Sequence, residues 1–587
     1  MPEKVKKNLF LAIAGGLLVF LLSTIVLNGR WNVQKAKAEA DTVTTTVTVV
    51  NSAPQWTVYP FEDLVSATTT PTNVGAYVTF KAVATDANAD DYFLAVCKSA
   101  NVTPHAGAPP TCDDGAWCVS ATTTSGTTST CSYLVQETDT LETYDWYAFV
   151  CDAFEGQPLC SSVSQGEGAS GSPFVVNHRP NFTSVSNDSP KDPGQTVTWT
   201  TVASDPDTLR GGDNIQLFVC STNQFDPLTG CLGETLATST FATSNPSASY
   251  TIPIPKPDKA YDGYVFIIDE FNLAATGTAQ GSNSVWTVSN VPPEVVTSTI
   301  TIYNWDGATD RLILTTEAGT TTGFKIRYQI IDNNSCWAEG GGSEISNILA
   351  YVYRSGIGQA GCDSAGEANN NNCYPEITNF ELGSCSGPEQ ASIWATTTFT
   401  LWYHADPTVT STPWESEVWK ASIKAIDDDN ATSTLGEGGE IELDAFLALA
   451  IEESAINYGS VIPGEPSEEQ TTTIKATGNT GLDQDLGGNP MVCSQEGSCG
   501  TSTISVDRQY WYLTSGTEWG APTSTYQNFL SASTTPVYCQ LECPKSTSTT
   551  PASKPTYWKI KVETAQPRGL YTGLNYFFAR MSDPSKW

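Results

Sequence analysis

The chain has 587 residues, which is too long for one hydrophobic core and predicts roughly three to five domains. Lys and Arg together number 28 against 63 Asp and Glu, so the formal net charge is −35. This charge argues against nucleic acid or an anionic membrane surface as a partner and makes cations the expected ligands. A hydrophobic content of 39%, with 16 Trp, can fill real cores and excludes global disorder.

The N-terminus carries the features of an export signal. Lys4, Lys6 and Lys7 precede a charge-free run of 19 residues from Leu9 to Leu27, and the segment 36–40, AKAEA, offers small residues at signal-peptidase spacing. We expect residues 1–40 to be a cleaved signal peptide or, because the run can just span a bilayer, a helical anchor in the cell envelope. The chain is therefore expected outside the cell, at the cell surface, with its 16 cysteines in disulfides.

Three internal repeats follow this leader. The motif V-x-N-x-x-P begins each of them, with Asn51, Asn177 and Asn290 spaced 126 and 113 residues apart. Longer stretches of the first two repeats also align, VTFKAVATD with VTWTTVASD and YDWYAFVCDAF with YDGYVFIIDEF. Apolar residues alternate within them, which predicts strands with one buried face.

Short alternating strands between turns rich in Gly, Pro, Asn and Thr are typical of antiparallel two-sheet sandwiches. The sequence therefore predicts an all-β protein of tandem immunoglobulin-like β-sandwich domains, with no convincing helix after residue 40. We expect these domains at 44–176, 177–289, 290–440 with a Cys-rich insertion, and 441–587. The fourth lacks the N-x-x-P start, but INYGSVIPGEPSEEQTTTIKATGNTGLDQDL reads as strands joined by Gly-Pro and Asn-Gly turns. Its opening resembles the YG-x-V-x-PG-E strand of several bacterial surface immunoglobulin-like modules.

Cysteines that are present or absent together between the repeats predict four disulfides. Cys97 and Cys112 both have counterparts in the second repeat, whereas the other cysteines of the first repeat disappear in twos. The expected pairs are Cys97 with Cys112, Cys118 with Cys131, Cys151 with Cys160, and Cys220 with Cys231. The third domain (Cys336, Cys362, Cys373, Cys385) and the fourth (Cys493, Cys499, Cys539, Cys543) each allow three connectivities, among which spacing does not choose.

Aspartates recur at two places in each repeat, the end of the second strand and the late hairpin. In an immunoglobulin-like sandwich these are the BC and FG loops, which lie at the same end of the domain, where the N-x-x-P linker enters. Converging carboxylates repel unless a cation neutralises them, and hard oxygen ligands in loops suit Ca²⁺. The candidate metal ligands are Asp86, Asp90, Asp91, Asp152, Asp205, Asp207, Asp213, Asp269, Asp332, Asp427, Asp428 and Asp429.

The motifs A-x-D-P-D and N-x-x-P resemble the Asp-rich calcium junctions of cadherin-like and related bacterial immunoglobulin-like repeats. The resemblance implies calcium between successive domains, although only the second repeat has the full D-P-D core, at Asp205 and Asp207. The alternative interpretation is that each Asp opens a turn by accepting a backbone N–H with its own side chain.

No catalytic signature is found, and we do not expect an enzyme. The three histidines, His105, His178 and His404, fall in three different domains, so a His-dependent site would have to be built across domains. The chain contains no HExxH, GxSxG, P-loop or Rossmann glycine pattern. A pair of glycosidase-type carboxylates among the many acids stays a minor alternative.

The whole order of motifs resembles that of large secreted surface proteins of small-genomed candidate-phylum bacteria. The motifs are the leader, the FLAVC-type Cys-rich repeats, the AYVYRSGIG, NNCY, GSCSG and LWYHADPT segments of the third domain, and the terminal module. The resemblance implies surface exposure. We expect a structural protein that assembles with itself into an S-layer-like coat, stabilised by disulfides and Ca²⁺. The alternative is an adhesin that binds a host cell or a glycan.

Overall fold

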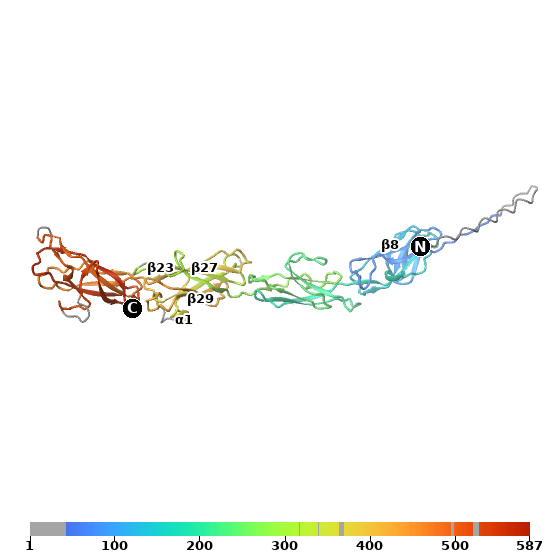
Figure 1. Ribbon diagram of the computed structural model, residues 1–587. Coiled ribbons are helices and arrows are strands. Elements are labelled where there is room, and N and C mark those ends of the chain that lie inside the picture. The colour runs from blue at the N-terminus through green and yellow to red at the C-terminus, as the bar shows by residue number, and fades with distance from the viewer. Residues whose placement is uncertain are drawn as a thin grey trace, which may run out of the picture.

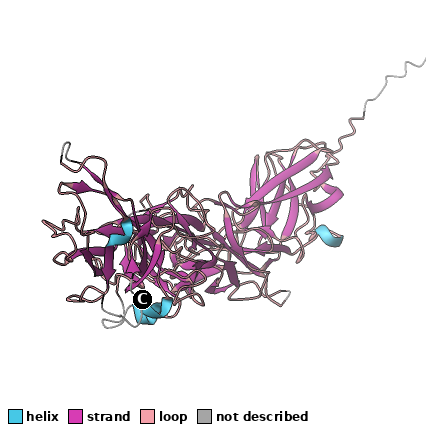
Figure 2. Ribbon diagram, turned by 60° about the vertical axis from the view of Figure 1, so that its left-hand side comes forward, coloured by secondary structure: helices cyan, strands magenta, loops and turns pink. Residues whose placement is uncertain are grey.

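The computed structural model describes residues 43–587 except Arg210, Thr316, Glu339 and the segments 363–368, 495–497 and 521–527. The expected segment 1–40 lies outside the described residues. Four sandwiches follow one another in a row from the N-terminal to the C-terminal side (Figure 1), and each has its own hydrophobic core. Strands dominate every one of them (Figure 2), which confirms the all-β immunoglobulin-like architecture.

One short helix departs from the expectation of none after residue 40. It is α1, Gly358–Cys362, which carries Cys362 to its disulfide partner Cys373. Single 3-10 turns occur at Gly168–Ser170, Val506–Arg508 and Pro584–Lys586. Among the described residues no helix has the length and apolarity needed to cross a membrane.

The first sandwich forms because its strands alternate buried and exposed residues. In β3 the residues Val78, Phe80, Ala82 and Ala84 are buried and face Trp146 in the core. The sheets are built from β1 (Gln55–Glu62), β3 (Tyr77–Thr85) and β8 (Thr128–Leu134); β10 (Tyr147–Asp152), β4 (Tyr92–Cys97) and β7 (Ala116–Val119); and β2 (Thr72–Asn73), β11 (Phe174–Asn177) and β9 (Thr143–Tyr144). A hairpin of β5 (Val102–His105) and β6 (Ala108–Cys112) extends from it.

The second sandwich repeats this plan. Trp199 on the strand equivalent to β3 packs edge to face against Trp286, and both are buried. Its sheets are β12 (Asn181–Asn187), β13 (Thr196–Ser204) and β18 (Ser247–Thr251); β17 (Thr235–Thr238), β14 (Ile215–Cys220) and β20 (Tyr264–Asp269); with the ladders β15 (Phe225–Asp226) to β16 (Gly230–Cys231) and β19 (Ala260–Tyr261) to β21 (Trp286–Thr287).

The third sandwich has longer strands and the largest core. Its core includes Ile441 and Leu443, just beyond residue 440. The two sheets are β22 (Glu294–Asn304), β23 (Thr321–Ile331), β27 (Ser392–Trp402) and β26 (Phe380–Leu382); and β25 (Cys373–Ile377), β24 (Ile345–Arg354), β28 (Trp419–Asp427) and β29 (Gly436–Ile441).

The fourth sandwich is closed by the C-terminal strand, and the chain end returns to the junction with the third sandwich (Figure 1), where Trp587 lies near Trp414. Its sheets are β30 (Leu449–Ile451), β31 (Gln470–Ala476), β39 (Ser553–Ile560), β35 (Gln509–Tyr512) and β36 (Asn528–Phe529); β37 (Ser531–Ala532), β32 (Leu482–Gly488), β38 (Val537–Cys543) and β41 (Asn575–Met581); and β34 (Thr503–Ile504), β33 (Met491–Cys493) and β40 (Tyr571–Thr572).

All four predicted disulfides are confirmed, and the structure chooses connectivities that spacing left open. The pairs formed are Cys97–Cys112, Cys118–Cys131, Cys151–Cys160, Cys220–Cys231, Cys336–Cys385, Cys362–Cys373 and Cys493–Cys499. The expectation that every cysteine pairs is wrong for Cys539 and Cys543, which are buried thiols. Both lie on β38 with Leu541 between them, and both pack in the core of the fourth sandwich.

Candidate metal sites at the domain junctions

The asparagine of each N-x-x-P motif lies against the aspartate that ends the late hairpin strand of its domain. In all three repeats Nδ2 of the asparagine donates a hydrogen bond to Oδ2 of the aspartate. The pairs are Asn51 and Asp152 at 2.9 Å, Asn177 and Asp269 at 2.8 Å, and Asn290 and Asp427 at 3.1 Å. The other oxygen, Oδ1 of each asparagine, is buried and has no hydrogen-bond partner within the described chain.

A second aspartate follows the β3-type strand in each repeat. In all three repeats its two carboxylate oxygens have different environments. Its Oδ1 accepts the backbone N–H two residues later, so the turn-capping interpretation is confirmed for this atom. The contacts are Asp86 with Asn88 at 2.7 Å, Asp205 with Asp207 at 2.9 Å, and Asp332 with Asn334 at 2.8 Å. Its Oδ2, however, is buried and unpartnered among the described residues in all three repeats. Capping therefore accounts for only half of each carboxylate.

A third acid precedes the following strand. The first two repeats supply Asp90, two residues before β4, and Asp213, two residues before β14, both predicted from sequence. The third repeat supplies Glu344, which the sequence analysis missed, immediately before β24. Glu344 is only 2% exposed, and its Oε1 has no hydrogen-bond partner in the described structure. The signal that could have revealed it is the position, an acid directly ahead of a buried strand, rather than an aspartate motif.

The junction between the first and second domains is the most compact of the three sites. One ligand oxygen from each of Asp205, Asp207 and Asp213 lies within 4.8 Å of the others. Burial is the main cause that raises the pKa of Asp205 to about 8, and the charges of Asp207, Asp269 and Asp213 add to it. Burial also raises the pKa of Asp269 to about 6, against the hydrogen bonds from Asn177 and from the loop backbone. The metal-free cluster therefore holds protons near neutral pH.

His178, the residue after the linker asparagine, connects this cluster to the first domain. Its backbone N–H and its Nδ1 both bond to Asp207, at 2.7 and 2.6 Å, and its Nε2 donates to the carbonyl of Asp139 at 2.6 Å. The hydrogen bond to Asp207 is the main cause that raises the pKa of His178. On the other side of the junction Glu142 accepts the backbone N–H of Leu209 at 2.7 Å.

The junction between the second and third domains gathers acids from both partners. Burial raises the pKa of Asp332 to about 7 and that of Glu344 to about 9, the latter helped by the charge of Asp428. Asp258 of the second domain, also missed in the sequence analysis, lies near Asp428 and Asp429, and burial raises its pKa to about 6. The predicted residues Asp428 and Asp429 are exposed at the rim of this cluster.

The first site lies at the N-terminal end of the first domain and is more open. The pKa of Asp90 is raised by desolvation and by the charges of Asp86, Asp152 and Asp91, so the structure brings these four predicted residues together. Asp91 itself is exposed. In each of the three sites the candidate metal ligands are carboxylate oxygens and one amide carbonyl oxygen. Ca²⁺ is commonly bound by this set of oxygens in flexible loops.

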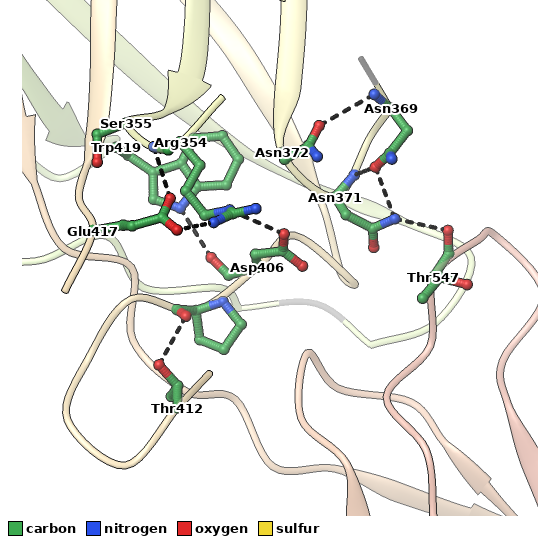
Figure 3. A network of polar contacts seen from close by, with 12 residues as sticks. Arg354, Ser355, Asn369, Asn371, Asn372, Asp406, Thr412, Glu417, Trp419 and Thr547 are labelled. Carbon is green, nitrogen blue, oxygen red and sulfur yellow. Dashed lines mark hydrogen bonds and ion pairs between the residues drawn. The ribbon is translucent and has the colours of Figure 1, made fainter. Parts of the chain in front are cut away.

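The junction between the third and fourth domains is built differently. Lys545 of the fourth domain is buried there, and its Nζ lies 2.9 Å from Oδ1 of Asp406 in the third domain. Arg354 pairs with the other oxygen of Asp406 at 3.2 Å and with Glu417 (Figure 3). Here basic side chains of the protein neutralise the buried acid.

No known protein family matches the chain, and no curated protein matches it. Among solved structures it is similar to a marsupial T cell receptor, at 8% sequence identity and a TM-score of 0.22, over 60% of this chain and 93% of that chain.

Proposed function

We propose that this chain is a structural protein of the cell surface, a row of sandwich domains whose junctions are stiffened by Ca²⁺ and which assembles with itself into an S-layer-like coat. The disulfides and the immunoglobulin-like fold fit an extracellular structural or binding protein. The net charge of −35 supports a partner that is cationic.

One observation carries the calcium part of this proposal. In three successive repeats the same two atoms, Oδ1 of the linker asparagine and Oδ2 of the BC-loop aspartate, are buried without a partner in the described chain. A buried polar atom without a partner costs about 1–3 kcal/mol, so the repetition of the same unpartnered pair in three domains supports a ligand at each site. A cation bound between these oxygens satisfies both and offsets the repulsion among the acids.

Calcium at these positions would fix the angle between neighbouring domains. At the second site Asn177 ends β11 of the first domain, whereas the acids Asp205 and Asp269 belong to the second, so one ion would tie the two domains together. At the second site His178 and Glu142 already connect the same loops to the preceding domain. A row of domains fixed in this way transmits force along its length, as a coat or a stalk requires.

The test uses calorimetry and small-angle scattering on the exported chain. Calcium titrated into chelator-treated protein is expected to bind at three sites, and the radius of gyration is expected to rise as the row straightens. No heat of binding at millimolar Ca²⁺ and no change in scattering would remove the calcium part. Electron microscopy of the cell surface tests the coat: a periodic array containing this chain supports it, and sparse projecting stalks contradict it.

An adhesin that binds a glycan is the second candidate, and one observation favours it. An open groove of about 600 Å³ on the third domain is lined by Trp305, Tyr374 and Phe399, with Asn379 among its polar residues. Of these three aromatic residues Trp305 is the exposed one, at 63%, and an exposed indole near an amide is suited to stacking on a sugar ring. Binding of the chain to a glycan array that is lost in Trp305→Ala would favour this function over the coat.

A further inference from the structure

The buried junction between the third and fourth domains places an amine beside an amide. Nζ of Lys545 lies 3.0 Å from Oδ1 of Asn371, and the two residues are 174 positions apart in the chain. The amide carbon is about 1.2 Å from that oxygen, so Nζ lies within about 4 Å of the carbon it would attack. Lys545 and Asn371 are both buried, at 3% and 7% exposure, so water is largely excluded from the contact.

Asp406 also contacts the amine. Its Oδ1 is 2.9 Å from Nζ of Lys545, and the residue is 4% exposed. Burial favours the neutral form of both groups: it raises the pKa of Asp406 and lowers the pKa of Lys545. Transfer of one proton from the ammonium to the carboxylate therefore produces a neutral, nucleophilic amine in place.

The amide of Asn371 is held by hydrogen bonds at both of its ends. Its Oδ1 also lies 3.0 Å from Nδ1 of His404, whose pKa is lowered to about 4 by burial and by the charge of Lys545, so a neutral imidazole donates to it. Its Nδ2 donates to Oδ1 of Asn369 and to the carbonyl of Thr547, each at 2.9 Å (Figure 3). Donors on the oxygen stabilise the negative charge that develops there when the carbon is attacked.

We propose that Lys545 and Asn371 form a covalent isopeptide bond that joins the third domain to the fourth, with Asp406 as the proton-transfer residue. Asp406 accepts a proton from the ammonium of Lys545. The lone pair of Nζ then forms a bond to Cγ of Asn371, and the electrons of the carbonyl move to Oδ1, which His404 stabilises.

The intermediate collapses as the bond between Cγ and Nδ2 breaks. Asp406 carries the proton released by Nζ to Nδ2, which leaves as ammonia. One C–N bond forms and one breaks, nothing is oxidised or reduced, and no further reactant enters. The product bridges two domains independently of Ca²⁺, and Arg354 remains as the basic partner of Asp406.

The test is the intact mass of the exported, non-reduced chain. The wild type is expected to be lighter than its disulfide-bonded sequence by the mass of one ammonia, and a tryptic digest is expected to contain a branched peptide that links Asn371 to Lys545. Lys545→Arg and Asp406→Asn are expected to have the mass of their disulfide-bonded sequences, without loss of ammonia. Lys554→Arg, a matched change on β39 of the same domain, is expected to keep the loss of ammonia.

Folding of the variants is checked separately by circular dichroism and by formation of the Cys336–Cys385 disulfide of the third domain. A wild-type chain at full mass, with Asn371 and Lys545 recovered on separate peptides after prolonged incubation, overturns the proposal. Loss of ammonia that persists in Lys545→Arg also overturns it, because the deamidation then lies elsewhere.

Discussion

Replacing Asp205 by asparagine is expected to change the stability of the second domain in opposite directions with and without calcium. Asn keeps the size of the side chain and one oxygen, which continues to accept the N–H of Asp207. It removes the charge that a cation would need. It also removes the repulsion with Asp207, Asp213 and Asp269 that the metal-free protein has to bear.

The magnitude follows from the pKa of Asp205, which burial raises from 3.8 to about 8. A carboxyl group with a raised folded-state pKa stabilises the fold fully below the unfolded value, and this contribution is lost as the pH rises toward the folded value. At about 1.4 kcal/mol for each pKa unit, the loss by pH 7 would be about 4 kcal/mol for a fully buried group. Solvent around the half-buried Asp205 reduces it to about 1–2 kcal/mol. Metal-free Asp205→Asn should therefore unfold about 5–10 °C above the wild type at pH 7.

Calcium is expected to reverse this order. At a Ca²⁺ concentration 100 times the dissociation constant, binding stabilises the wild type by about 2.7 kcal/mol, and the variant gains less because it has lost a ligand. Calorimetric melting with chelator and with Ca²⁺ measures both effects. Asp226→Asn in the β15–β16 turn is the matched control, since it removes the same charge where an amide can still cap the turn. An equal calcium effect on wild type and Asp205→Asn would refute the reasoning.

Three further outcomes are expected. Burial raises the pKa of Asp332 to about 7 and that of Glu344 to about 9. The chelated chain should therefore lose stability as the pH rises from about 4 to 9. Ca²⁺ binding at pH 6 should release protons, which calorimetry in buffers of different ionisation enthalpy measures. Leu273 of the second domain packs in the core of the first domain. Leu273→Ala should lower the free energy of unfolding by about 2–4 kcal/mol and split the melting of these two domains into two transitions. A single transition in the variant would contradict their coupling through Leu273. Removing the Cys336–Cys385 disulfide, with a sequence separation of 49, should cost about 4 kcal/mol, against about 3 kcal/mol for Cys220–Cys231 with a separation of 11, as measured by denaturant unfolding.

Repetition made much of this architecture readable from sequence. The alternation of Val78, Phe80 and Ala82 predicted a strand because side chains of a strand point to opposite faces with a period of two. Cysteines that are kept together or lost together between aligned repeats identified four disulfides, because a cysteine that has lost its bonded partner can no longer form the bond. The same alignment placed Asp86, Asp205 and Asp332 at equivalent strand ends.

Features without a repeated counterpart needed the structure. Glu344 and Asp258 join their cluster from a different loop and a different domain, and no local pattern encodes such distances. The unpaired thiols Cys539 and Cys543 lie on one strand, β38, whose register against β32 shifts between them, and both pack in the same core.

The sequence by itself determined the strands, the repeats and the acidic loops, because each of these is a local pattern or a comparison of one repeat with another. Only the tertiary structure decided which atoms meet. Asn371, Asp406 and Lys545 come from three distant segments of two domains, and their encounter depends on how two sandwiches dock, a packing outcome that no stretch of sequence contains.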